Sequence, residues 1–179
     1  LQTRYETKTR NVAASIKVNN TPVKPNTKNL GTSPATMFGY VQKAWDAYTA
    51  RRRRATVNAS RTNAVRTIEK ELGTLKLNLV LFKAVRDRAR ASTGSKTLTT
   101  YIKRVIDMYS TYIKHYEDAY AKAKRGQNPP LSLMSSDAFE FSKQAVRFIH
   151  FASASLGGAA LPFKTQKRRR TLSPGEVLN

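Results

Sequence analysis

The residues best suited to chemistry in this chain are arginines and lysines gathered between positions 51 and 90. They are Arg51, Arg52, Arg53, Arg54, Arg61, Arg66, Lys70, Lys76, Lys83, Arg86, Arg88 and Arg90. The acids of the same stretch are Glu69, Glu71 and Asp87. Guanidinium and ammonium groups hold phosphate oxygens through charge-assisted hydrogen bonds. There are too few acids to pair with these bases at a spacing of four residues. The stretch therefore predicts a phosphate-binding surface and not a charge-balanced solvated face.

The spacing of these bases predicts where they would lie. Intervals of four place Arg54 and Arg66 on one side of a helix, with Asn58 and Thr62 between them. Farther along, a basic stripe separates from the apolar positions of a third helix and comprises Lys76, Lys83, Arg86 and Arg90. Side chains of these types contact phosphate and sugar without reading base sequence.

Two terminal extensions carry more positive charge. We predict a basic extended arm over residues 1–33, which includes Lys24 and Lys28, because its composition cannot bury enough apolar surface to fold alone. Only a short amphipathic turn is possible there, formed by Val12, Ile16 and Val18. Residues 162–179 read as a second basic tail, in which phosphate-binding candidates are Arg168, Arg169 and Arg170. A nuclear targeting signal is the competing interpretation of these short basic runs.

The whole chain is strongly cationic. Lys and Arg number 33 against 11 Asp and Glu, and the formal net charge is +22. Such an excess repels itself unless a polyanion neutralises it, and nucleic acid is the commonest polyanion. An anionic membrane surface is a weaker alternative because the apolar helix faces are needed for a bundle. No apolar run approaches the roughly 18 residues that span a bilayer, so we expect no membrane span.

Residues suited to catalysis are sparse, and the sequence predicts a protein that is not an enzyme and has no metal site or cofactor. Cysteine is absent, and the two histidines, His115 and His150, read as packed or surface side chains. Residues 93–97 resemble a phosphate-binding loop but lack its first glycine and do not follow a strand. Glu69 and Glu71 lie two residues apart, which points them to different sides of a helix.

Helical periodicity predicts the elements that would position the basic residues. Ser33 and Pro34 fit the cap and first position of a helix whose apolar residues are Met37, Phe38, Val41, Trp45 and Tyr48. A second periodic stretch covers 57–72 and stops at Gly73, and these two stretches are either one bent helix or a helix pair. A third helix is expected over 74–91, with Leu77 and Leu81 widening its apolar face, before a loop.

The fourth helix has the clearest pattern, a heptad seam. Its apolar residues are Leu98, Ile102, Val105, Tyr109, Tyr112, Tyr116, Ala119 and Ala123. Gly126 and the following prolines end it. We expect most of its tyrosines, including Tyr101 and Tyr120, to pack in the core, although they could instead stack on unpaired bases. A fifth helix starts near Asp137, where Glu140 allows reciprocal capping, and ends at Gly157. Its inner face comprises Phe141, Ala145, Phe148, Ile149, Ala152 and Leu156.

These elements predict an all-α bundle of four to five helices over residues 34–161. The layout resembles the major capsid proteins of filamentous archaeal viruses, through the arm up to Lys28, the helix start at Ser33 and the basic segment from Arg51 to Arg66. The resemblance implies a protein without a catalytic site, whose copies or paralogues form a sheath around linear DNA in a virion. It also implies that Arg51–Arg54, Arg61, Arg66 and the arm lysines face the DNA.

We therefore expect a structural protein that packages nucleic acid without sequence specificity, as a capsid or nucleocapsid subunit, with DNA favoured over RNA. The alternative is a ribosomal protein, possibly organellar, whose basic extensions thread between RNA helices. Multiple copies on one polymer would favour packaging, whereas one defined RNA site would favour the ribosome.

Overall fold

The structure of the chain is a computed structural model that describes residues 24–54, 64–158, 161–164 and 166. The described part contains four α-helices: α2 (Pro34–Arg54), α3 (Ala64–Ala91), α4 (Lys96–Lys124) and α5 (Ser136–Ser155). Two short 3-10 helices, η1 (Lys28–Leu30) and η2 (Leu131–Met134), precede α2 and α5. No β-strand occurs in the described residues, so the predicted all-α helical bundle is confirmed.

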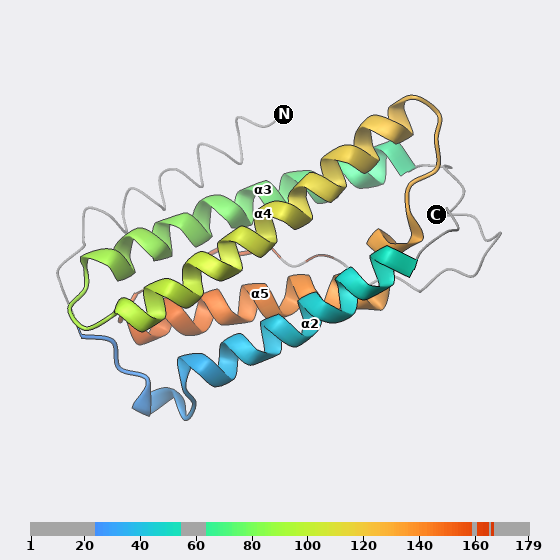
Figure 1. The fold of residues 1–179 in the computed structure, drawn as a ribbon. Coiled ribbons are helices and arrows are strands. Elements are labelled where there is room, and N and C mark those ends of the chain that lie inside the picture. The colour runs from blue at the N-terminus through green and yellow to red at the C-terminus, as the bar shows by residue number, and fades with distance from the viewer. Residues whose placement is uncertain (1–23, 55–63, 159–160, 165, 167–179) are drawn as a thin grey trace.

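The four helices alternate in direction and pack in two layers (Figure 1). Helix α3 packs mainly on α4, and α2 packs mainly on α5. Aromatic contacts fix the register between the layers: Phe38 stacks on Tyr101 with ring centroids 4.9 Å apart, and Tyr48 meets Tyr112 at 5.2 Å. The apolar faces of all four helices therefore meet in one shared core.

Helix α4 provides the central surface of this core. Every position of the predicted heptad seam is buried, from Leu98 through Ala123. Tyr109, Tyr112 and Tyr116 are at most 1% exposed, which confirms the prediction that most tyrosines of this helix pack inside. Ile106 and Ile113 are also buried and widen the seam because α4 contacts three other helices.

Of the two N-terminal helix caps predicted from the sequence, one is confirmed and one is wrong. Ser33 Oγ accepts a hydrogen bond from the Thr36 amide at 3.2 Å, which confirms the predicted cap of α2. The predicted reciprocal capping of the last helix by Asp137 and Glu140 is wrong. The cap is Ser135, whose Oγ accepts from the Ala138 amide at 3.2 Å, and this hydroxyl also donates to the Ser132 carbonyl.

The predicted helix stop at Gly73 is also wrong, because α3 runs without interruption from Ala64 to Ala91. A glycine inside a helix costs about 1 kcal/mol relative to alanine. Leu72 and Leu75 flank this glycine and are 7% and 0% exposed, so their burial outweighs that cost. The third predicted helix and the part of the second predicted stretch that is described, from Ala64, are thus one helix, and residues 57–63 lie outside the described residues.

The chain beyond α5 turns back and packs on the bundle. We call residues 161–164 and Gln166 the C-terminal strap. Phe163 packs against Phe82, with ring centroids 5.5 Å apart. The buried Asn78 side chain donates to the Lys164 carbonyl at 2.7 Å and accepts from the Lys164 amide at 2.8 Å. Part of the segment that the sequence analysis assigned to the tail is therefore attached to the bundle.

Candidate nucleic-acid interface

The arginine run Arg51–Arg54 forms the C-terminal turn of α2, where cations interact favourably with the negative end of the helix dipole. Arg51 Nε lies 2.6 Å from Asp137 Oδ2, in the first turn of α5, and both side chains are about one-third or more exposed. Such an exposed ion pair contributes at most about 1 kcal/mol, so its main effect is to orient Arg51. Arg53 and Arg54 are exposed and are available to an external anion.

Arg52 is half-buried near a hydrogen-bonded pair between two helices. Tyr48 Oη lies 2.8 Å from His115 Nδ1. Desolvation by burial, and then the positive charge of Arg52, lower the pKa of His115 to about 4, while Asp118 opposes the shift. His115 is therefore neutral at physiological pH, and its place in this pair agrees with the expected packed histidine.

The exposed side of α3 carries a row of cations. Lys76, Lys83 and Arg90 are exposed and recur every seven residues, and we call these three residues the α3 stripe. Lys76 Nζ lies 3.5 Å from Glu117 of α4, and Arg90 Nη1 lies 3.9 Å from Asp87. These pairs are solvent-exposed and weak, so an anionic polymer can compete for the same cations.

Arg86, the fourth predicted residue of the basic stripe on α3, is less accessible than the other three. It is half-buried, and its guanidinium binds Asp87 at 3.2 Å. Arg66 is exposed in the first turn of α3, about 36 Å from Arg90 along the helix axis. The predicted basic positions of α3 therefore extend over most of its length.

The expectation that Arg54 and Arg66 share one helix is wrong, because α2 ends at Arg54 and α3 begins at Ala64. Asn58, Thr62 and Arg61 lie outside the described residues, as do Arg168, Arg169 and Arg170. Lys24 and Lys28 are exposed, and Lys24 approaches the α3–α4 turn, opposite the end that carries Arg51–Arg54 (Figure 1). The candidate residues thus lie at both ends of the bundle and along α3.

Sequence reasoning missed basic residues on α4. Lys96, Lys103 and Lys114 are exposed and fall on the same side of α4 as Glu117, which meets Lys76 of the α3 stripe. Their spacing by seven and eleven residues was a detectable signal, but the apolar seam of this helix dominated its interpretation. Asp107 and Glu117 are exposed on the same side of α4 and offset part of this charge, so α4 adds single cations beside the α3 stripe.

Arg88, in contrast, has a structural role. Its Nη2 donates to the Leu156 carbonyl at 3.1 Å, at the C-terminal end of α5. This places a cation where the unsatisfied carbonyls of that helix accumulate, which stabilises the helix end. Unlike the exposed cations of the α3 stripe, Arg88 therefore bonds to the backbone of its own bundle.

The buried tyrosines are not available to stack on bases. Burial raises the pKa values of Tyr48, Tyr109 and Tyr112. Each hydroxyl has a partner inside the protein, such as Asn78 Nδ2 at 3.1 Å from Tyr109 Oη. Tyr40, which is 52% exposed on α2, is more accessible than any of them.

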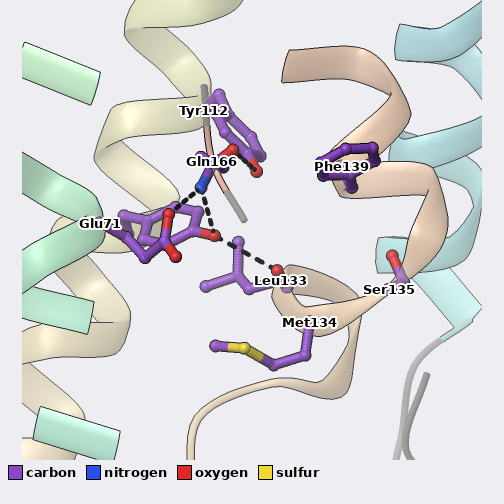
Figure 2. A pocket seen from close by; sticks show the side chains of 8 residues that line it. Glu71, Tyr112, Leu133, Met134, Ser135, Phe139 and Gln166 are labelled. Carbon is purple, nitrogen blue, oxygen red and sulfur yellow. Dashed lines mark hydrogen bonds between the residues drawn. The ribbon is translucent and has the colours of Figure 1, made fainter. Parts of the chain in front are cut away.

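A small polar cavity lies where the strap meets the helices. Figure 2 shows Gln166 donating to Glu71 at 2.6 Å and to the Tyr116 hydroxyl at 3.1 Å. The cavity, of about 20 Å³, has room for about one water molecule. This arrangement anchors the strap and has no space for a substrate.

In the part of the chain that the structure describes, no group of three or more His, Asp or Glu side chains could hold a metal ion. None of the helices within the described ranges has a stretch long and apolar enough to cross a membrane.

Comparisons with known protein families, with curated proteins and with solved structures find no match to this chain.

Proposed function

We propose that this chain is a structural protein that packages nucleic acid, as one of many copies in a capsid or nucleocapsid. It holds the phosphate backbone with arginine and lysine and does not read base sequence. DNA is the favoured polymer, and a virion is the proposed location. The proposal is supported by a bundle with one shared apolar core, on which all the described lysines and most of the described arginines are exposed.

One observation supports the proposal most directly, the row of exposed cations along α3. The α3 stripe runs from Lys76 to Arg90, which is about 21 Å along the helix axis. An extended duplex presents phosphates about every 3.4 Å on each strand, so a straight basic surface of this length can contact several of them. A bound small anion would need a concave site, whereas a linear polyanion fits a long convex face.

The test removes the α3 stripe and measures binding to a labelled duplex as a function of salt concentration. The variant is Lys76→Gln/Lys83→Gln/Arg90→Gln. If the wild-type chain contacts about ten phosphates, the slope of log affinity against log salt is about −9. Loss of three phosphate contacts reduces its magnitude by about 2.7.

A matched control separates position from total charge. Lys43, Lys143 and Arg147 are exposed on α2 and α5, the layer opposite α3 and α4. Their conversion to glutamine removes the same charge and leaves the stripe intact. Equal effects of the two triple variants on the salt slope would show that the stripe has no special role. If the wild-type chain binds neither duplex nor single-stranded nucleic acid at low salt, the proposal is overturned.

Copy number tests packaging against the ribosomal alternative. Sedimentation and negative-stain imaging of the chain with long duplex DNA should show many copies on one polymer. A single copy on one RNA, released by ribonuclease and not by deoxyribonuclease, would contradict packaging and favour the ribosomal interpretation.

A further inference from the structure

The layer formed by α2 and α5 has exposed cations of its own. Lys143 Nζ lies 3.9 Å from Glu140 Oε2. None of the others forms an ion pair with an acid in the described part of the chain, whereas two of the three residues of the α3 stripe do. We call these others the α2–α5 cations, and they are Lys43, Arg53, Arg54 and Arg147. Their charge is therefore available to an external anion.

The α2–α5 cations lie on the outer face of their layer. Lys43 precedes the buried Tyr48 by five residues, which places it about 140° round α2 from that core position. Arg54 follows Lys43 by eleven residues, about three full turns, and so lies on the same side of α2. Arg147 precedes the buried Ile149 by two residues, about 160° round α5. The layer of α3 and α4 packs on the opposite, inner side (Figure 1).

One stretch of duplex cannot contact both this outer face and the α3 stripe. A helix with its side chains is about 10–12 Å across, so two packed layers separate the faces by about 20 Å. Double-stranded DNA is stiff over about 150 bp, and bending a site of 20–30 bp through 40–90° already costs on the order of 1–6 kcal/mol. Wrapping around a single bundle would need a much sharper bend. The two faces therefore suit two separate segments of nucleic acid.

We propose that each copy of the chain bridges two duplex segments, one on the α3 stripe and the other on the α2–α5 cations. The inference rests on the proposed function and extends it, because a subunit with two such faces draws distant segments of one polymer together. All four helices share one core, so the two faces are rigidly joined. Guanidinium and ammonium groups contact backbone phosphates without reading bases, so the second segment can have any sequence.

The α2–α5 cations should bind their segment second and more weakly than the α3 stripe binds the first. They are spread over two helices, whereas the stripe is one straight row. Asp46 lies seven residues before Arg53, and Glu140 lies seven residues before Arg147, so each acid shares a side of its helix with a cation. With duplex in trace amounts, the first segment therefore binds at the stripe, and the second face contributes when more duplex is present.

Capture of a second duplex by a first one tests the proposal. A biotinylated duplex of about 20 bp, too short to bend around the bundle, is fixed on beads and loaded with the full-length chain at low salt. The beads are washed, and a fluorescent duplex of unrelated sequence is added. The wild-type chain should retain the fluorescent duplex on the beads, and rising salt should release it before the protein leaves the first duplex.

The decisive variant is Arg53→Gln/Arg54→Gln/Arg147→Gln, which removes three of the four α2–α5 cations. It should bind trace duplex with the wild-type salt slope, because the α3 stripe is intact. It should capture at least about tenfold less of the second duplex, because three phosphate contacts on that face are lost.

The matched control is Lys122→Gln/Lys124→Gln/Arg125→Gln. It removes the same charge from exposed positions at the C-terminal end of α4, away from both faces. This control should capture as much of the second duplex as the wild-type chain does, so a loss that is common to both variants would point to total charge and overturn the assignment.

Other outcomes distinguish this inference from the proposed function. If the wild-type chain binds the first duplex but captures no second one, or if the Arg53/Arg54/Arg147 variant captures as much as wild type, bridging through this face is wrong and the proposed function stands. If the wild-type chain binds no duplex at all, both are overturned. Sedimentation without nucleic acid completes the test: self-association of the wild-type chain that the variant loses would assign these cations to a second copy and overturn bridging.

Discussion

Replacement of Asn78 by alanine should release the C-terminal strap and weaken the bundle. This asparagine is 0% exposed, and its side-chain amide forms two hydrogen bonds with the Lys164 backbone and one with the Tyr109 hydroxyl. At about 1 kcal/mol net for each hydrogen bond, the change costs about 3 kcal/mol. A bundle of ordinary stability, about 5–15 kcal/mol, remains folded after this loss.

Urea unfolding followed by circular dichroism measures the total cost, and hydrogen exchange of the strap amides measures its local release. Exchange at Phe163 and Lys164 should accelerate more than exchange in the middle of α4, because the strap can detach while the helices stay packed. Asn128→Ala is the matched control, since Asn128 is exposed between α4 and η2 and its truncation should have little effect.

A second substitution separates the loss of hydrogen bonds from the loss of volume. Asn78→Asp keeps the shape, but an ionised carboxylate cannot donate to the Lys164 carbonyl and is costly to bury. Burial favours the neutral acid, so this variant should recover stability relative to wild type as the pH falls from 7 to 4. If Asn78→Ala costs less than about 0.5 kcal/mol, or strap exchange is unchanged, the strap does not depend on this amide.

Three further predictions concern other positions. Gly73→Ala should stabilise the protein by about 0.5–1 kcal/mol in urea unfolding, because Gly73 is exposed within α3 and an added Cβ meets nothing within 4 Å; a loss of stability would contradict the continuous helix. Because the pKa of His115 is lowered to about 4, folding favours its neutral form. The contribution of this histidine to the free energy of unfolding is complete above pH 6.5 and is lost as the pH falls toward 4. His115→Gln, which can still bond the Tyr48 hydroxyl, should flatten this decline relative to wild type in thermal melts across pH; parallel curves would refute the assignment. Arg88→Met should lower stability by about 1 kcal/mol, because it removes the hydrogen bond to the Leu156 carbonyl, and an unchanged melting temperature would exclude that role.

The sequence predicted the fold best where the helical period was regular. The seam of α4 was predicted residue by residue because its apolar positions step by three and four over the length of the helix. The caps were harder to predict, since Ser135, Ser136 and Asp137 are all suitable cap residues and tertiary packing selects among them.

Two errors have a common physical origin. The stop at Gly73 and the shared helix for Arg54 and Arg66 both came from local signals. The local preference of a glycine is weak compared with the burial of Leu72 and Leu75 on either side. Pairwise side-chain contacts decide such cases, and a single sequence does not reveal them.

The candidate interface was predictable in part. Exposure of Lys76, Lys83 and Arg90 agrees with a stripe read from helical spacing. The inward direction of Arg88 could not be read, because it depends on where α5 ends in space. The strap could not be predicted for the same reason. Its contacts join Asn78 to Lys164, 86 residues apart, and Glu71 to Gln166, 95 residues apart.

The described polypeptide enters the bundle beside Gly94 and leaves it beside Glu71, positions near opposite ends of α3. A peptide linker that joins Gln166 of one copy to Lys24 of the next would therefore not have to double back across a subunit. Genetically fused tandem dimers should consequently preserve both bundles, and they offer a way to fix the order of differently mutated subunits in a row.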